Sequence, residues 1–248
     1  NESFYGIKIQ NLYSFILKND FIKGKGSLVK KSIKREYEEC LIEKSGVFPN
    51  LKIIWDCGNG ATGEIISSLV KRLPGYHKVL FGEIDGNFPN HHPDPTIEAN
   101  LLDLINEMKT GKYDIGVAFD GDADRIGVVD NKGSIIWADQ LMALFLPEII
   151  NPNDQVIFDV KCSKVLEDMI LKHNGKPEMW KTGHSLIKQR MAELKCKFGG
   201  EMSGHIFMAD DYFGYDDAIY VAARAVQMLS KSDKKISDLK EALPQYFS

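Results

Sequence analysis

From residue 51 onward, short runs of apolar and β-branched residues alternate with segments whose apolar residues recur at helical spacing. The runs LKIIWD (51–56), KVLFGE (78–83) and DIGVAF (114–119) have the length and composition of buried strands. Helices are predicted between them, one over residues 64–72 and one capped by Thr96. Alternating strands and helices are typical of α/β structures in which helices cover both faces of a sheet.

The same alternation then begins a second time. After a hairpin around NKG (131–133) and a helix over residues 140–150, the turn cluster NPND (151–154) separates the two series. Further strands are predicted in QVIFDV, PEMW and KFGGEMSGHIFM, with a helix over residues 163–173, one capped by Ser185 and a last apolar-striped helix. We therefore predict two consecutive three-layer α/β/α domains with mixed sheets, at residues 46–150 and 151–248. Residues 1–45 are expected to be the remnant of a further α/β domain.

Charge and composition exclude some classes of partner. The chain has 31 basic and 35 acidic residues among 248, for a net charge of −4, so no overall positive field would hold a nucleic acid. The basic stretch from Lys18 to Arg35 is expected to be a solvated face or linker. The longest apolar stretch is too short for a membrane span, and four dispersed cysteines are expected to be reduced thiols in the cytoplasm.

The motif DGDADR places three carboxylates, Asp120, Asp122 and Asp124, directly after an apolar strand. An unpaired buried carboxylate costs several kcal/mol, so a positive partner must meet them. Ligands in buried parallel sheets sit at the carboxyl ends of the strands, and oxygen ligands suit Mg²⁺, Ca²⁺ or Mn²⁺. The sequence therefore predicts a metal site here. A haloacid-dehalogenase-type phosphatase, which also opens with an acidic pair after a strand, is the alternative.

A second group of polar residues lies in other loops of the later series. FGGEMSGH places Glu201, Ser203 and His205 at alternate positions, where a carboxylate and a hydroxyl could hold sugar hydroxyls. Lys161 follows a strand, and His184 precedes a helix, which are positions where a phosphate meets positive charge and free N–H groups. Together these loops predict one side of a cleft.

These motifs in this order resemble the α-D-phosphohexomutases of the bacterial phosphomannomutase/phosphoglucomutase type. The resemblance rests on DGNFPNHHPDP, DGDADR, FDVKCS, WKTGHSLIK and GEMSGH, and it extends over essentially the whole chain. It implies a phosphoserine enzyme that interconverts hexose 1-phosphates and hexose 6-phosphates, of glucose or mannose, through a bisphosphate intermediate. Mg²⁺ is the implied cofactor.

The resemblance also implies roles for individual residues. Asp120, Asp122 and Asp124 would bind Mg²⁺, and Arg125 would lie near the transferring phosphoryl group. Glu201 and Ser203 would contact the sugar. The basic side chains Lys161, His184 and His205 would match basic residues of the family's third domain, one of which serves in proton transfer. Lys161 and His184 would also contact the substrate.

Two features of the family pattern are missing from these residues. The phosphoserine loop T-[AG]-S-H-N-P and the fourth domain's phosphate loop do not occur. We therefore expect a fragment covering the second and third domains that does not turn over alone. A hexose-phosphate-binding module without chemistry is the remaining alternative, and the oligomeric state is left open.

Overall fold

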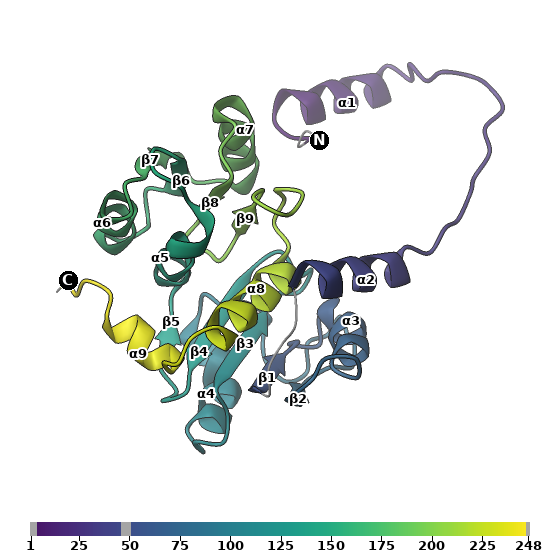
Figure 1. Cartoon of the computed structure of the whole chain (residues 1–248). Coiled ribbons are helices and arrows are strands. Elements are labelled where there is room, and N and C mark those ends of the chain that lie inside the picture. Colours follow the sequence, from purple (N-terminus) through teal and green to yellow (C-terminus); the bar gives the residue numbers. More distant parts are fainter. Residues whose placement is uncertain (1–3, 46–50, 247–248) are drawn as a thin grey trace.

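The computed structural model describes residues 4–45 and 51–246, which form two mixed β-sheets with helices packed on them (Figure 1). The strand order is β2-β1-β3-β4-β5 in the first sheet and β7-β6-β8-β9 in the second. The strands are β1 (Lys52–Asp56), β2 (Tyr76–Leu80), β3 (Ile115–Phe119), β4 (Ile126–Asp130), β5 (Ile135–Ile136), β6 (Gln155–Asp159), β7 (Lys176–Trp180), β8 (Phe198–Gly200) and β9 (Ile206–Met208). The helices are α1 (Ile7–Leu17), α2 (Lys34–Ser45), α3 (Thr62–Leu69), the 3-10 turn η1 (Glu98–Leu101), α4 (Leu102–Met108), α5 (Ala138–Ile149), α6 (Lys164–Lys172), α7 (His184–Leu194), α8 (Ala218–Ser230) and α9 (Ile236–Glu241).

The first sheet has a parallel half and an antiparallel half. β1 pairs in parallel with β2 and β3, whereas β4 runs antiparallel to both β3 and β5. Side chains alternate between the faces, so that Ile53 and Val117 join one apolar cluster while Ile54 and Ala118 join another with α4. The mixed α/β architecture expected from the sequence is confirmed.

The second sheet repeats this plan with fewer strands. β6 pairs in parallel with β7 and β8, and β8 forms an antiparallel hairpin with β9. Val156 and Phe158 face α5 and α6, while Ile157 packs with Ile187 and Met191 of α7 on the opposite face. In the first sheet the parallel strand β3 turns back into β4, and in the second sheet the parallel strand β8 turns back into β9. Each sheet therefore has a hairpin loop at the carboxyl end of that parallel strand.

Helix α8 connects the two sheets although it follows the second one in the chain. It packs against β3 and β4 of the first sheet and also against β9 and α2. One apolar cluster therefore includes residues of both sheets, among them Phe119, Phe198 and Val226. The two α/β units share a continuous core.

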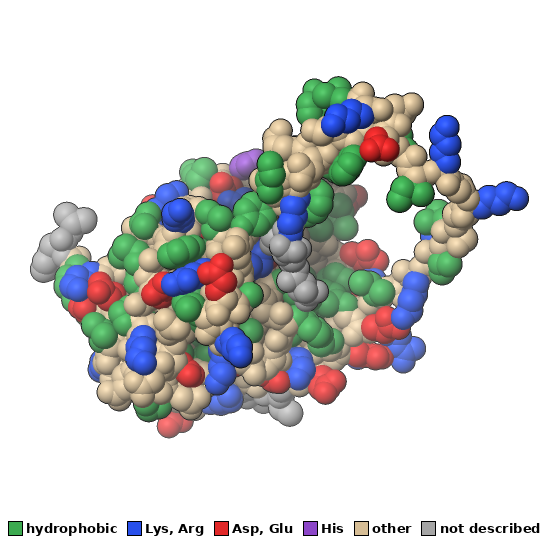
Figure 2. Space-filling view, turned by 90° about the horizontal axis from the view of Figure 1, so that it is seen from above, with side chains coloured by type: hydrophobic (Ala, Val, Ile, Leu, Met, Phe, Trp, Pro, Cys, Tyr) green, Lys and Arg blue, Asp and Glu red, His purple; other side chains and the backbone are tan. Residues whose placement is uncertain are grey.

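The segment before the first sheet is divided between a packed helix and an exposed arm. Leu41 of α2 is buried, and the hydroxyl of Tyr37 donates to both carboxylate oxygens of Asp217 at 2.9 Å. By contrast, α1 has no buried residue in its described range, and an extended stretch joins it to α2 (Figure 1). Apolar side chains gather on this arm, with basic ones along the stretch that follows (Figure 2). The basic run is exposed, as expected.

Several predicted boundaries and caps differ from the structure. The strand expected at 78–83 spans Tyr76–Leu80, because Phe81 has a φ of 50° and leaves the extended conformation. Thr96 caps no helix, since its N–H and hydroxyl both donate to Oδ1 of Asp94. Ser185 lies inside α7, whose N-cap is Gly183 with a φ of 136°. Helix α9 was not predicted.

Two expectations about the whole chain concern membranes and thiols. Within the described ranges, every helix is too short or too polar to cross a bilayer. All four cysteines are free, and three of them are buried.

Candidate functional site

The acidic loop, residues 120–125, joins β3 to β4 at the edge where the apolar strand ends. Oδ1 of Asp120 accepts the backbone N–H groups of Asp124 at 3.0 Å and Arg125 at 3.1 Å, which folds the loop around this buried carboxylate. Ala123 adopts a left-handed φ of 72° at the turn. One oxygen from each of Asp120, Asp122 and Asp124 lies within 4.8 Å of the others. The structure thus brings together the three residues predicted as metal ligands.

Arg125 is fixed beside this loop by two carboxylates. Its Nε donates to Oδ2 of Asp120 at 2.8 Å, and its Nη1 pairs with Oδ1 of Asp94 at 3.1 Å. Burial lowers the pKa of Arg125, but the acidic partners outweigh this and raise it above its usual value. The guanidinium is therefore a permanent positive charge held at the rim of the acidic loop.

The clustering of carboxylates is costly without a cation. Burial raises the pKa of Asp124 to about 7, and the nearby Asp120 and Asp122 add to this, while His205 lowers it. A divalent cation would relieve this repulsion. The donor set consists of carboxylate oxygens, which are the ligands that Mg²⁺ prefers, so these residues fit a magnesium ion.

The hairpin loop, residues 201–205, joins β8 to β9. Glu201 is only 3% exposed, and one of its carboxylate oxygens accepts the backbone N–H of Gly183. Its other oxygen accepts the Ser203 hydroxyl at 3.3 Å. The structure brings Glu201 and Ser203 together, as their spacing suggested, and it uses the carboxylate to position the start of α7 as well.

The acidic loop and the hairpin loop touch directly, although they belong to different sheets. The backbone N–H of Ile126 donates to the carbonyl of Gly204 at 3.2 Å. Nδ1 of His205 lies 3.6 Å from Oδ1 of Asp124. At the other side of the acidic loop, the carbonyl of Ala123 accepts the N–H of Ala218, the first residue of α8. These contacts fix the position of one loop relative to the other.

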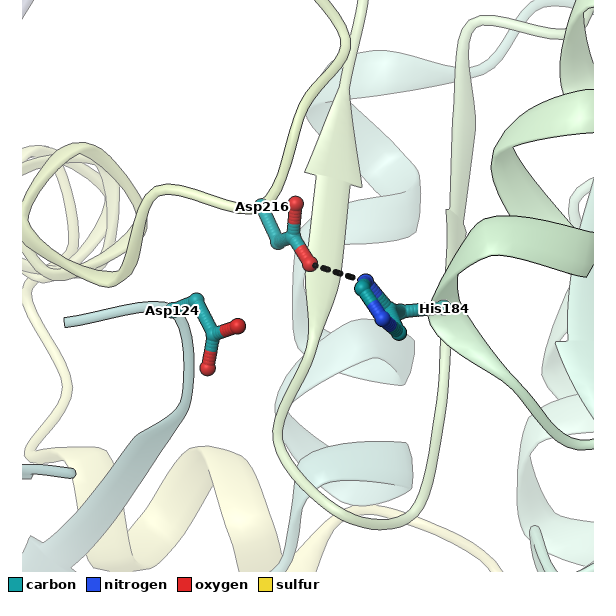
Figure 3. A group of neighbouring side chains, drawn as sticks. All are labelled: Asp124, His184 and Asp216. Atoms are coloured by element: carbon teal, nitrogen blue, oxygen red, sulfur yellow. Dashed lines mark ion pairs between the residues drawn. The ribbon is translucent and has the colours of Figure 1, made fainter. Parts of the chain in front are cut away.

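Asp216 gathers the basic residues around this junction. Its Oδ2 lies 3.2 Å from Nδ1 of His184 and 3.1 Å from Nδ1 of His205, and its Oδ1 accepts from Nζ of Lys188 at 2.7 Å. The two imidazole rings stack with centroids 5.2 Å apart. Figure 3 shows Asp216 and His184 joined by their ion pair, with Asp124 to the left of them.

The charges of this group support one another. Burial raises the pKa of Asp216, but His205 and Lys188 outweigh it and hold that pKa well below its usual range. Burial lowers the pKa of His205, whereas Asp216 and Asp124 raise it, with a net shift above the ordinary value. The imidazole of His205 is therefore favoured in its protonated form.

Lys161 is placed differently from the other predicted residues. It is exposed, in the loop after β6, and makes no ion pair within the described part of the chain. The loop itself is anchored by buried Asp159, which accepts the hydroxyl of Thr182 at 2.9 Å and the N–H of Met202 at 3.1 Å. Asp159 thus ties the Lys161 loop to the segment before α7 and to the hairpin loop.

Models of one protein family match most of the chain. The phosphoglucomutase/phosphomannomutase alpha/beta/alpha domain II matches residues 32–133, and domain III of the same family matches residues 137–247. The chain belongs to the phosphoglucomutase/phosphomannomutase family. This assignment supports the mutase resemblance over the phosphatase alternative.

Individual members of this family are similar along nearly the whole chain. A phosphomannomutase/phosphoglucomutase of Pseudomonas syringae pv. tomato is 44% identical over 97% of the chain, and a phosphoglucomutase of Neisseria gonorrhoeae is 42% identical over 98%. The crystal structure of a phosphoglucomutase/phosphomannomutase family protein from Burkholderia thailandensis superposes with a TM-score of 0.92 at 42% identity, over 97% of this chain and 53% of that one. The chain spans about half of the curated relatives, 52% and 54% respectively.

The two family domains meet before α5, between residues 133 and 137. The boundary that we predicted between residues 150 and 151 follows α5 and stays a prediction. Helix α5 packs against α6 and β8 and also contacts β4, so it lies between the two sheets.

Sequence reasoning missed three acidic residues of this candidate site. Asp94 and Asp159 lie inside the quoted motifs HHPDP and FDVKCS, where an acid beside a proline or at a strand end was a usable signal. Asp216 lies in YDDAIY, immediately before a predicted helix, and only the folded chain shows that it faces His184 and His205.

Replacing Gly204 by Ala should separate the acidic loop from the hairpin loop. Gly204 has a φ of +100°, and an added Cβ would lie 2.7 Å from the carbonyl oxygen of Ile126. Gly111 is the matched control. Its φ of +72° also strains an alanine, but no atom would lie within 4 Å of the added Cβ. In urea-induced unfolding we expect Gly204→Ala to lose about 1–3 kcal/mol more than Gly111→Ala. Equal losses would mean that the contact between the loops is not tight.

His91 should stabilise the chain in a pH-dependent way. Its Nε2 lies 3.1 Å from both carboxylate oxygens of buried Asp56, and its Nδ1 lies 3.0 Å from the carbonyl of His92. Both ring nitrogens face acceptors, so only the imidazolium satisfies both. The hydrogen bond to Asp56 is the main reason that the pKa of His91 is raised. A raised pKa stabilises the fold at low pH, and this contribution is lost as pH rises through the folded-state value.

The test compares wild type with His91→Gln in urea at several pH values. We expect the variant to be less stable by about 1–2 kcal/mol in acid, with a difference that shrinks in alkaline solution. His173→Gln is the control, since His173 makes no ion pair among the described residues. A difference independent of pH would show that His91 acts as a neutral group.

Proposed function

We propose that this chain supplies the metal-binding loop and the sugar- and phosphate-binding loops of a phosphohexomutase. The reaction interconverts hexose 1-phosphate and hexose 6-phosphate, with glucose or mannose as the hexose, through a phosphoserine and a bisphosphate intermediate. The observation that carries the proposal is the direct contact of the acidic loop with the hairpin loop through Ile126 and Gly204. This contact supports the proposal, because it brings the loop of the proposed metal ligands next to the loop of the proposed sugar ligands.

Phosphoryl transfer needs positioning of the reactants and neutralisation of charge on the phosphoryl oxygens. In this proposal Asp120, Asp122 and Asp124 hold Mg²⁺, which supplies that neutralisation when bound. Arg125 adds a fixed positive charge next to the same oxygens. Its attachment to Asp94 and Asp120 keeps the guanidinium in place before the substrate arrives.

The sugar phosphate would be held by the second half of the chain. Ser203 and Glu201 provide a hydroxyl and a carboxylate for sugar hydroxyls. Lys161 and His184 are exposed side chains that would meet the phosphate, and His205 is enclosed beside acidic groups that raise its pKa. We assign phosphate contact to all three basic residues and proton transfer to one of them.

Removing one carboxylate from the acidic loop should weaken Mg²⁺ binding. Asp122 is exposed and makes no hydrogen bond within the described ranges, so Asp122→Asn changes the ligand set without disturbing the fold. Isothermal titration should show at least about 10-fold weaker Mg²⁺ binding than in wild type, which corresponds to about 1.4 kcal/mol. Asp103→Asn, on the exposed side of α4, is the control. Unchanged affinity in Asp122→Asn would remove this residue from the site.

Lys161 should contribute to binding of a hexose phosphate. We expect Lys161→Ala to weaken binding of glucose 1-phosphate or mannose 1-phosphate about 5- to 10-fold, because one charge-assisted contact is lost. Lys172→Ala is the matched control, since Lys172 is also exposed but lies at the far end of α6. Chemical-shift titration of the purified chain measures the affinities.

The outcomes of that titration separate two kinds of binding. Weaker binding in Lys161→Ala alone supports a phosphate contact at this loop. Equal weakening in both lysine variants would indicate general attraction of an anion by positive charge, and the assignment of Lys161 would fail. Unphosphorylated glucose should produce no comparable shifts.

A further inference from the structure

A second cluster of potential metal ligands lies beside the acidic loop and differs from it in chemistry. Asp124, His184 and Asp216 each offer a donor atom within 4.8 Å of the others, and they come from three separate segments of the chain (Figure 3). His205 lies beside this group, because its Nδ1 lies 3.1 Å from Oδ2 of Asp216 and 3.6 Å from Oδ1 of Asp124, and after loss of its Nδ1 proton it would be a fourth donor. The cluster therefore contains two imidazole nitrogens and two carboxylate oxygens.

Three separations between these donors are close to those in the site of a small four-coordinate cation. Metal–ligand bonds of about 2.0–2.1 Å in a tetrahedral zinc site put neighbouring donor atoms about 3.3 Å apart. The separations here are 3.1 Å between Asp216 and His205, 3.2 Å between Asp216 and His184, and 3.6 Å between His205 and Asp124. Small movements of the side chains would make all of these distances compatible with one ion.

Two atoms of the cluster lack the hydrogen bonds that burial normally requires. Oδ2 of Asp216 and Nδ1 of His205 are both enclosed, and neither makes a hydrogen bond in the part of the chain that the structure describes. The Asp216 side chain is 8% exposed, and this oxygen faces the cluster. Nδ1 of His205 and Oδ2 of Asp216 are close enough to attract each other electrostatically. The direction from one atom to the other, however, does not suit an N–H···O bond. A cation between them would satisfy both.

Surrounding residues hold the cluster in place. Lys188 occupies Oδ1 of Asp216, which leaves Oδ2 directed at the histidines. The next residue, Asp217, is fixed by the hydroxyls of Tyr37 and Tyr212. Partners of this kind orient metal ligands in known sites.

We propose that Asp124, His184, His205 and Asp216 form a binding site for a zinc-type transition-metal ion, distinct from the magnesium site. Mixed imidazole and carboxylate donors select such ions over Mg²⁺, which prefers oxygen alone. Asp124 belongs to both ligand sets. Zn²⁺ at the second site therefore competes with Mg²⁺ for Asp124 and occupies two histidines that the proposed function uses for phosphate.

Cobalt(II) is the probe, because four-coordinate Co²⁺ with nitrogen and oxygen donors absorbs visible light far more strongly than the six-coordinate ion. The purified chain is titrated with Co²⁺, and Zn²⁺ is then added to displace it. We expect strong visible bands that Zn²⁺ abolishes. His184→Ala and Asp216→Asn should each weaken Co²⁺ binding at least about 10-fold.

Asp122→Asn is the matched control, because this residue belongs only to the magnesium site. Bands that survive in Asp122→Asn and weaken in His184→Ala support the proposal. His184 is half-exposed, so its replacement leaves the core intact, and circular dichroism checks the fold of each variant. Weak bands typical of six-coordinate Co²⁺, or bands lost in Asp122→Asn and unchanged in His184→Ala, would overturn the proposal by placing cobalt at the three aspartates.

Discussion

The packing of helix α8 is the constraint on which the arrangement of this chain depends. The helix follows the second sheet, yet its apolar residues are buried against strands of the first sheet and against α2. Burial of one fully enclosed aliphatic side chain contributes about 1.5–3 kcal/mol, so a whole helix face holds the sheets together strongly. Because Asp217 caps α8 and Ala218 bonds to the acidic loop, the start of this helix is also part of the site.

The site contains many acidic side chains, and they have two kinds of partner: basic side chains of the chain itself and cations from solution. Asp120 and Asp94 share Arg125 as their basic partner, and Asp216 pairs with Lys188 and lies beside His184 and His205. Asp122 makes no ion pair among the described residues, so a cation from solution would be its partner. The placement of Asp124 between these groups makes it sensitive to whichever cation is bound, because it faces Asp120 on one side and His205 on the other.

Sequence patterns predicted the elements well where local signals were strong. β3 and the acidic loop followed from an uninterrupted apolar run and alternating acids, and both sheets proved mixed. Local signals failed where a tertiary contact decided the outcome. Thr96 turned to Asp94 instead of capping a helix, and α8 crossed to the other sheet, which no pattern within the helix could reveal.

The candidate site was predictable to a similar degree. The three aspartates lie on one short loop, so spacing alone indicated that Asp120, Asp122 and Asp124 converge. The cluster around Asp216 combines residues from separate segments, and its existence depends on how the two sheets are joined. Periodicity carries no information about such contacts.

The anchoring of three loops by Asp159 has a consequence for the thermodynamics of recognition. This one carboxylate bonds to Cys162, Thr182 and Met202, which belong to three different connections at the same end of the second sheet. Their conformational entropy is therefore lost when the chain folds, and little remains to be lost when a ligand arrives. A small anion meeting this surface should find a rigid, pre-organised wall, so its affinity should be governed mainly by the exchange of water for protein contacts.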